Sequence, residues 1–436
     1  MERLIYNQLV LWKNDEKHKP LILLGARQVG KTYILNLFGK QEFDNYVYVN
    51  CHNNDFTTSL FRSFDIDRII VDIERYSGKK IVLGKTLLVF DEIQEVYNGI
   101  ASLKYFCEQM PQLHVAVAGS LLGITLRKGE SFPVGKVDVL SMYPMTYMEY
   151  LMACDKKNIV QSLFECDWRV VELEQEYLTN RLREYYFVGG MPEAVNEFLS
   201  TGNLKKTRQI QNDIIDAYGR DISKHTKAEA QRIRQIWESV PAQLAKENKK
   251  FIFGMLKKGA RAASFEVALQ WLVDAGLVYK VERCKTPLLP LKFYADSSAF
   301  KIYLLDVGLL AAMAQTDPKD ILLGNKVFSE FKGAFTENYV LEQLKSIKNL
   351  YQYYFSKDNS QLEIDFLLQC AGKIIPAEVK AEVNVKSKSL RSFVNENDSA
   401  KMGLRFSMKL YEEQGWMTNV PLCAVEAFMK KMTDDE

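Results

Sequence analysis

Short, uninterrupted apolar runs recur through the N-terminal third of the chain. They lie at residues 21–24, 46–49, 86–90 and 114–118. Runs of this kind are typical of strands that are buried on both faces of a parallel sheet. Apolar residues at helical spacing precede the first run and follow it as far as Phe38. Because strands alternate with helices, the pattern predicts a parallel α/β sheet.

Long helical patterns replace the apolar runs after about residue 145. They extend from 147 to about 196 and from 204 to 217. Residues 264–280 predict a helix that ends at Gly276 and is followed by a strand, an order that suits a winged helix. β-type runs return at 351–355, 362–368 and 374–379, so we expect a second α/β or α+β unit there.

The composition indicates packed globular domains. Of the 436 residues, 47% are hydrophobic and 26% are charged, with only 23 Gly and 11 Pro, which argues against a disordered or collagenous protein. The seven Cys contain no CxxC pair, which argues against a zinc ribbon and favours a reducing compartment. We find neither a secretory leader nor an apolar stretch of membrane-spanning length, and therefore expect a cytoplasmic protein with no membrane partner.

A glycine-rich motif follows the first apolar run. Residues 25–32, Gly-Ala-Arg-Gln-Val-Gly-Lys-Thr, fit the pattern G-x-x-x-x-G-K-[ST] between a predicted strand and a predicted helix. Its glycines let the backbone N–H groups face an anion, and the helix N-terminus adds its positive end. Lys31 is expected to reach the β- and γ-phosphates of ATP, and the Thr32 hydroxyl to ligate Mg²⁺. A surface turn is the alternative, but strand, loop and helix all agree with the motif. The predicted cofactor-binding residues are Gly25, Ala26, Arg27, Gln28, Val29, Gly30, Lys31 and Thr32.

Two carboxylates end the apolar run at residues 87–90. Asp91 is expected to hold the Mg²⁺ and Glu92 to orient the attacking water as a base or positioning group. A helix-capping role is the alternative. The order of the motifs along the chain favours the catalytic interpretation.

The run at residues 114–118 leads into Gly119 and Ser120. A polar residue at the tip of this strand can sense the γ-phosphate, which makes Ser120 a candidate catalytic residue. An N-cap for a helix that starts at Leu121 is an equal alternative. An arginine from a neighbouring copy, and hence self-association, is also expected to complete such a site. The sequence does not choose among Arg127, Arg181, Arg183 and Arg220.

The chain resembles prokaryotic AAA-type ATPases that carry a C-terminal domain of unassigned role. The resemblance rests on GARQVGKT at 25–32, LLVFDE at 87–92, AGS at 118–120, SFPVGKV at 131–137 with Tyr143-Pro144, FVGGMPEA at 187–194 and KIYLLDVGL at 301–309. It implies Mg²⁺-dependent ATP hydrolysis. Lys136 stands where many relatives have Arg, and Ser120 where many have Asn. Both departures bear on the part of ATP hydrolysis that a neighbouring subunit would contribute. Lys is a point charge and lacks the planar fork of Arg.

A second set of charged residues lies near the C-terminus. Glu337 falls in a predicted helix, Asp365 in an alternating strand, and Glu378 and Lys380 share one face of the next strand. A hairpin would bring Asp365 beside Glu378 and Lys380.

This set, E…D…ExK, resembles the PD-(D/E)xK nuclease fold. The resemblance implies that Asp365 and Glu378 bind a metal, that Lys380 positions a water, and that Glu337 completes the acidic cluster. A solvated strand face with ordinary charge pairs is the alternative.

The predicted architecture is α/β throughout: a P-loop parallel-sheet ATPase domain at 1–155, a helical, winged-helix-like region at 156–320, and a restriction-endonuclease-like domain at 321–436. The net charge is only +2, but residues 201–261 contain 14 Lys+Arg and 6 Asp+Glu. These basic residues could track the phosphates of DNA or another nucleic acid, or simply form solvated helix faces. The leading hypothesis is that nucleotide state controls engagement of nucleic acid. The alternative is a nucleotide-dependent switch or scaffold that binds a protein partner through an inert C-terminal fold.

Overall fold

The structure is a computed structural model. It describes residues 1–52, 54–119, 132–246, 249–257, 259, 261–323, 326–357, 362–382 and 386–434, and the backbone alone at 326–331 and 434. The chain divides into two compact units. The N-terminal unit comprises residues 1–143 with 274–276, and the C-terminal unit comprises residues 144–273 and 277–436.

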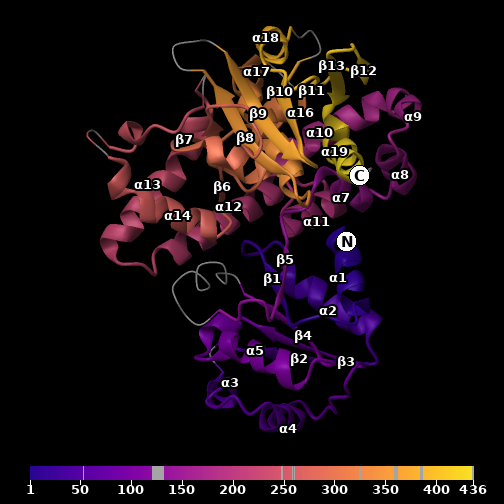
Figure 1. The fold of residues 1–436 in the computed structure, drawn as a ribbon, viewed down its shortest axis with the longest axis vertical. Coiled ribbons are helices and arrows are strands. Elements are labelled where there is room, and N and C mark those ends of the chain that lie inside the picture. The colour runs from indigo at the N-terminus through magenta and orange to yellow at the C-terminus, as the bar shows by residue number, and fades with distance from the viewer. Residues whose placement is uncertain are drawn as a thin grey trace. The chain divides into compact units, whose positions relative to one another are not determined.

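The N-terminal unit is built on a five-stranded sheet in the order β2-β3-β4-β1-β5, in which neighbouring strands pair in parallel (Figure 1). The elements are α1 (Ile5–Asn14), β1 (Leu21–Leu24), α2 (Lys31–Glu42), β2 (Asn45–Asn50), α3 (Asp55–Leu60), α4 (Ile66–Ser77), β3 (Thr86–Asp91), α5 (Gly99–Gln109), β4 (His114–Ala118) and β5 (Asp138–Ser141). The predicted parallel sheet is therefore confirmed.

Burial explains why the sequence pattern found four of these strands and missed the fifth. Strands β3 and β4 are buried along their whole length, so they appear as continuous apolar runs. Strand β5 lies at the edge of the sheet beside β1, and its residues alternate between half-buried and exposed. Only a weak period-two pattern marks it in the sequence.

The C-terminal unit begins with a helical region. Its helices are α7 (Tyr147–Ala153), α8 (Lys157–Glu165), α9 (Trp168–Leu173), α10 (Gln175–Val188), α11 (Pro192–Thr201), α12 (Leu204–Ile222), α13 (Lys227–Leu244) and α14 (Glu266–Asp274). The helical pattern predicted from 147 to about 196 is thus interrupted several times. Gly189, with φ 73°, ends α10, and Pro192 begins α11 because its fixed φ suits a first helical turn.

A mixed eight-stranded sheet forms the rest of the C-terminal unit, in the order β12-β13-β11-β10-β9-β8-β6-β7 (Figure 1). Its strands are β6 (Val278–Cys284), β7 (Ala295–Leu304), β8 (Tyr351–Ser356), β9 (Glu363–Cys370), β10 (Lys373–Val379), β11 (Gly403–Ser407), β12 (Glu412–Glu413) and β13 (Met417–Pro421). The accompanying helices are α15 (Val307–Met313), α16 (Pro318–Leu323), α17 (Lys326–Lys345), α18 (Lys388–Glu396) and α19 (Val425–Asp434).

The predicted helix, Gly276 and following strand correspond to α14, a glycine with φ 70° and β6. Strand β6 pairs antiparallel with β7 and then parallel with β8 through Arg283 and Cys284. The β6–β7 hairpin is therefore part of the C-terminal sheet. The chain as a whole is α/β, with a parallel P-loop-type sheet and a separate mixed sheet.

Candidate functional site

The glycine-rich loop adopts a backbone that few side chains tolerate. Gly25 and Gly30 have φ values of 151° and 98°, and Gln28 is left-handed at 65°. A Cβ at Gly25 would overlap the Met142 carbonyl oxygen, so glycine is also required there for close approach. The loop leads directly into α2, whose N-terminus supplies backbone N–H groups.

Arg3 anchors this loop, and the sequence motifs gave no sign of it. The side chain is 7% exposed, and its guanidinium donates to the Val29 carbonyl at 2.9 Å and to the Tyr143 carbonyl at 2.7 Å. These partners lie 26 and 140 residues away in the chain. Arg3 therefore connects the residues before α1 to the glycine-rich loop and to the last residue of the N-terminal unit's main segment.

Lys31 lies folded back on the loop that carries it. Its ammonium donates to the Gly25 carbonyl at 2.8 Å and to the Ala26 carbonyl at 2.7 Å. Burial lowers the pKa of Lys31 to about 8, although the carboxylates of Glu92 and Asp91 oppose that shift. An anion placed at this loop would meet a buried cation whose present partners are uncharged carbonyls.

Asp91 is where three elements of the site converge. Its Oδ2 accepts a hydrogen bond from the Thr32 hydroxyl of α2 at 2.8 Å and another from the Tyr48 hydroxyl of β2 at 2.8 Å. Burial and the hydrogen bond to Asp91 raise the pKa of Tyr48, so this phenol stays a donor. The structure thus brings Thr32 and Asp91, two predicted magnesium ligands, into contact, and adds Tyr48.

Glu92 follows Asp91 in a left-handed backbone conformation with φ 54°. Its N–H donates to the Ala118 carbonyl at 2.7 Å, and its Oε2 accepts from Gln94 at 2.5 Å. A non-glycine residue in this conformation costs free energy and is common at functional sites. Ser120, which was predicted to act beside Glu92, lies outside the described residues, as does Arg127.

The residues present fit a magnesium nucleotide. The loop offers two positive-φ glycines, a helix N-terminus and the buried cation of Lys31, which suit phosphate oxygens. Thr32 and Asp91 place a hydroxyl and a carboxylate oxygen 2.8 Å apart, and such hard oxygen donors are the ones that Mg²⁺ prefers.

The C-terminal charged residues also come together, on one face of the mixed sheet. Glu337 of α17 is 3% exposed; it forms an ion pair with Lys249 and accepts a hydrogen bond from Tyr303 of β7 at 3.2 Å. Burial raises the pKa of Glu337, but the positive charges of Lys249 and Lys301 outweigh burial and lower it. The sequence analysis missed these cations as partners because they belong to a loop and a strand far upstream.

Asp365 and Glu378 lie on the adjacent strands β9 and β10, whose antiparallel register ends at Phe366 and Ala377. Asp365 accepts a hydrogen bond from the Val379 N–H at 2.8 Å, and Lys380 forms an ion pair with Glu378 at 2.8 Å. Burial, followed by the charge of Glu337, raises the pKa of Asp365. The predicted hairpin is present, and Asp365 interacts electrostatically with Lys380.

Three observations bear on metal binding at this cluster. In the part of the chain that the structure describes, no group of three or more His, Cys, Asp or Glu side chains is arranged to hold a metal ion. Within that part, however, Glu378 is only 6% exposed and its Oε2 has no hydrogen-bond partner. Lys301, 1% exposed, pairs with Glu363 at 2.6 Å and supplies positive charge within the cluster.

Many basic residues of segment 201–261 are used within the fold. Arg208 lies over the Phe187 ring and donates to the Thr316 carbonyl at 3.2 Å, while Lys206 pairs with Glu197 at 3.0 Å. Arg232 and Arg234 stay exposed on α13, and Lys258 lies outside the described residues. The net positive charge of this segment therefore overestimates the number of basic side chains that could contact phosphates.

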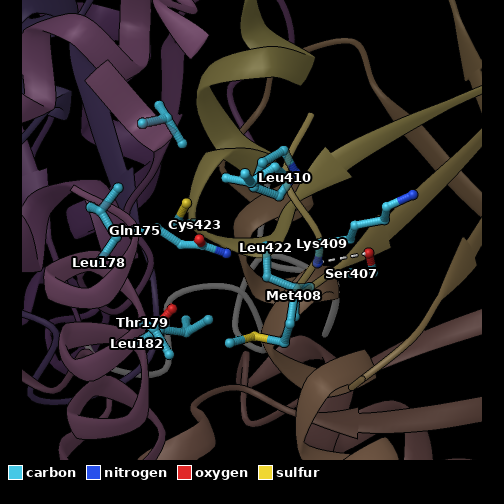
Figure 2. Close-up of a pocket in the computed structure, with 12 residues that line it drawn as sticks. Gln175, Leu178, Thr179, Leu182, Ser407, Met408, Lys409, Leu410, Leu422 and Cys423 are labelled. Atoms are coloured by element: carbon cyan, nitrogen blue, oxygen red, sulfur yellow. Dashed lines mark hydrogen bonds between the residues drawn. The ribbon is translucent and has the colours of Figure 1, made fainter. Parts of the chain in front are cut away.

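Among its described residues, the C-terminal unit contains a small hollow and a larger one. One, of about 20 Å³, has room for little more than a water molecule between α10 residues such as Leu178 and Thr179 and residues 407–410 (Figure 2). The other, of about 560 Å³, is an open groove between α12 and α13 lined by both acidic and basic side chains, including Asp216, Arg220 and Arg234.

No helix within the described ranges is long and apolar enough to cross a membrane.

Comparison with known families bears on the three parts of the chain separately. Residues 179–320 and 332–425 match two models that are described as domains of unknown function, DUF8612 and DUF4143. No match was found among the curated proteins.

Among solved structures, a Walker-type ATPase of Pyrococcus abyssi is 15% identical, with a TM-score of 0.42, over 71% of this chain and 94% of that chain. The Aeropyrum pernix ORC1 protein in complex with DNA is 12% identical, with a TM-score of 0.28, over 72% and 90%. The Cdc6p protein of Pyrobaculum aerophilum is 12% identical, with a TM-score of 0.24, over 73% of this chain and 93% of that chain.

Residues 17–151 match the model described as an AAA domain. The N-terminal unit is thus similar to AAA domains, and its parallel sheet and glycine-rich loop agree with that similarity.

Proposed function

We propose that the N-terminal unit binds ATP with Mg²⁺ and hydrolyses it. The observation that carries this proposal is the convergence of Lys31, the hydrogen-bonded pair Thr32 and Asp91, and Glu92 at one end of the parallel sheet. The backbone of residues 25–32 would hold the phosphates, with Thr32 and Asp91 holding Mg²⁺. Mg²⁺ would neutralise charge that develops on the phosphate oxygens.

Glu92 is proposed to orient the attacking water and accept its proton. Its carboxylate interacts electrostatically with Lys31, and its backbone N–H, directly after β3, is bonded to the Ala118 carbonyl. Ser120 is proposed to sense the γ-phosphate, and an arginine from a second copy to stabilise the transition state.

Substitution of the P-loop lysine tests the nucleotide site. Lys31→Ala should weaken ATP binding by about 10- to 100-fold, because hydrogen bonds to a charged group are lost. Lys40→Ala on the same helix is the matched control, since Lys40 is exposed beyond the loop. Titration of a fluorescent ATP analogue measures both. Unchanged affinity in Lys31→Ala would contradict the assignment.

The C-terminal unit is proposed to engage nucleic acid under control of the nucleotide state. Support comes from Glu337, Asp365, Glu378 and Lys380 lying on one face of the mixed sheet, and from the incompletely bonded Glu378 carboxylate. Asp365 and Glu378 would bind the metal, with Lys380 positioning a water for attack on phosphorus. The helical region with the β6–β7 hairpin would act as a winged-helix-like reader.

Paired carboxylate substitutions test this half of the proposal. Asp365→Ala and Glu378→Ala should each abolish cleavage of DNA or RNA with Mg²⁺ or Mn²⁺ present, because either loss removes a proposed metal ligand. Glu396→Ala is the control, since Glu396 pairs with Lys357 on the surface. A cleaving wild type whose activity survives in both variants would contradict the nuclease assignment.

A switch or scaffold that binds a protein partner is the second candidate function. The observation that favours it is that Lys249 and Lys301 already neutralise Glu337 and Glu363, as expected for a cluster with a structural role. A DNA titration at several salt concentrations separates the two candidates. Phosphate contacts predict affinity that falls steeply with salt, whereas absent or salt-independent binding favours the scaffold.

We further propose domains at 1–155, 156–320 and 321–436 and a cytoplasmic location. The location is supported by the seven cysteines of the sequence, which contain no CxxC pair.

A further inference from the structure

Tyr48 contacts the proposed metal-binding carboxylate although it belongs to none of the nucleotide-binding motifs. It lies on β2, paired with Val89 of β3 in a register that places Asn50 opposite Asp91. From there its hydroxyl reaches Asp91 Oδ2 at 2.8 Å. It comes from a third element, distinct from the strand of Asp91 and the helix of Thr32.

The direction of Tyr48 follows from the alternation of β2. Val47 and Val49 point into the hydrophobic core, so Tyr46 and Tyr48 point to the opposite face of the strand. Helix α2 packs there, since a Cβ at Gly39 would overlap the Tyr46 ring. Tyr46 donates its hydroxyl hydrogen to Asn36 within α2, whereas Tyr48 donates to Asp91. The two tyrosines therefore share a face and differ in their acceptor.

Three donors surround the Asp91 carboxylate. Thr32 and Tyr48 both donate to Oδ2 at 2.8 Å, and the Glu92 N–H approaches Oδ1 at 3.1 Å. If the Thr32 oxygen turns to a metal ion, Tyr48 is the side-chain donor that still fixes the carboxylate. A neutral phenol adds no charge to the site, so its effect is on orientation.

We propose that Tyr48 is a positioning residue that holds Asp91 for Mg²⁺, and that it thereby strengthens binding of the magnesium nucleotide rather than of the nucleotide alone. The inference rests on the proposed ATPase function. Partners that orient metal ligands typically change metal affinity by about 10- to 100-fold when they are removed.

The test compares Tyr48→Phe with Tyr46→Phe, each of which removes one hydroxyl from the same face of β2. The affinity for a fluorescent ATP analogue is measured for each full-length chain in EDTA and in Mg²⁺. In Tyr48→Phe we expect unchanged affinity in EDTA and about a tenfold smaller gain on addition of Mg²⁺. In Tyr46→Phe the gain should equal that of wild type.

Two results in the variants would overturn the inference. One is a Mg²⁺-dependent gain in Tyr48→Phe equal to that of wild type. The other is an equal loss of affinity in EDTA and in Mg²⁺, which would indicate a general effect on the loop. A wild-type chain that binds no nucleotide in either condition would overturn the proposed ATPase itself and this inference with it, and the wild-type titration alone identifies that outcome.

Discussion

At the scale of single residues, the N-terminal site depends on a few short contacts around Asp91 and Lys31. Thr32 and Tyr48 hold the carboxylate, while the ammonium of Lys31 is bound to two carbonyls of its own loop. Phosphate oxygens would replace those carbonyls as partners. Because phosphates carry charge and carbonyls do not, the protonated form of Lys31 should be favoured when nucleotide is bound.

This difference predicts proton uptake on binding. The pKa of Lys31 is lowered to about 8 in the free protein, so near pH 9 most of this side chain is neutral. Bound phosphates should raise that pKa, and the complex then takes up most of one proton near pH 9 but almost none near pH 6. Calorimetry in buffers of different ionisation enthalpy measures the uptake. Equal uptake at both pH values would contradict the prediction.

At the scale of elements, one junction in the C-terminal unit explains several residues of the family-like motifs. Asp306 begins α15 as its N-cap by accepting the Leu309 N–H at 2.8 Å, and it also accepts the Gly190 N–H at 2.5 Å. Gly190 in turn accepts from the Met145 N–H at 2.6 Å. Hydrogen bonds therefore connect the segments that precede α7, α11 and α15. These bonds are enough to explain the motifs at 187–194 and 301–309 by a structural role.

Glycine substitutions test this junction. A Cβ at Gly190 would overlap the Met145 carbonyl, so Gly190→Ala should destabilise the unit by about 1–3 kcal/mol. At Gly219, inside α12, a Cβ would meet nothing within 4 Å, so Gly219→Ala should stabilise by about 0.5–1 kcal/mol. Denaturant unfolding of the two variants measures the difference. The junction account fails if the effects have the same sign.

Asp306 also predicts a pH dependence of stability. Burial raises the pKa of Asp306 from 3.8 to about 6. Between these values the folded state binds more protons than the unfolded state, so this residue's contribution to stability falls as pH rises, by about 3 kcal/mol in total. Asp306→Asn should remove that contribution, and the free energy of unfolding should then fall less, or rise more, from about pH 4 to 6. Identical pH profiles would exclude the effect.

At the scale of the whole molecule, the sequence predicted the features that are formed by residues close together in the chain. The glycine-rich loop, the strand that ends in Asp91 and Glu92, and the hairpin of Asp365 and Glu378 are local patterns, and the structure contains each of them. Arg3 and Tyr48 could not be found in this way, because their partners are set by tertiary packing. The same holds for Lys249 and Lys301 beside the C-terminal carboxylates. The eight-stranded sheet also includes β6 and β7, and no local pattern predicts the pairing of β6 with β8.

Coupling between nucleotide state and nucleic acid is the prediction at this scale. The side chains of Arg232 and Arg234 are exposed on α13, and phosphate contacts by them would make binding salt-dependent. Replacing both by Ala should weaken DNA binding about uniformly across sequences and reduce the salt slope by about 2. Fluorescence anisotropy with and without ATP measures this. An unchanged slope would remove α13 from the interface.

Single-turnover ATP hydrolysis by Glu92→Gln tests the central claim most directly. The variant keeps the size of the side chain and one acceptor oxygen, but its amide cannot accept a proton from water. The account predicts ATP binding in Mg²⁺ equal to that of wild type and a rate of phosphate release lower by about 10²- to 10⁴-fold. A rate equal to that of a hydrolysing wild type would contradict the role of Glu92, and a wild type that releases no phosphate would contradict the proposed ATPase.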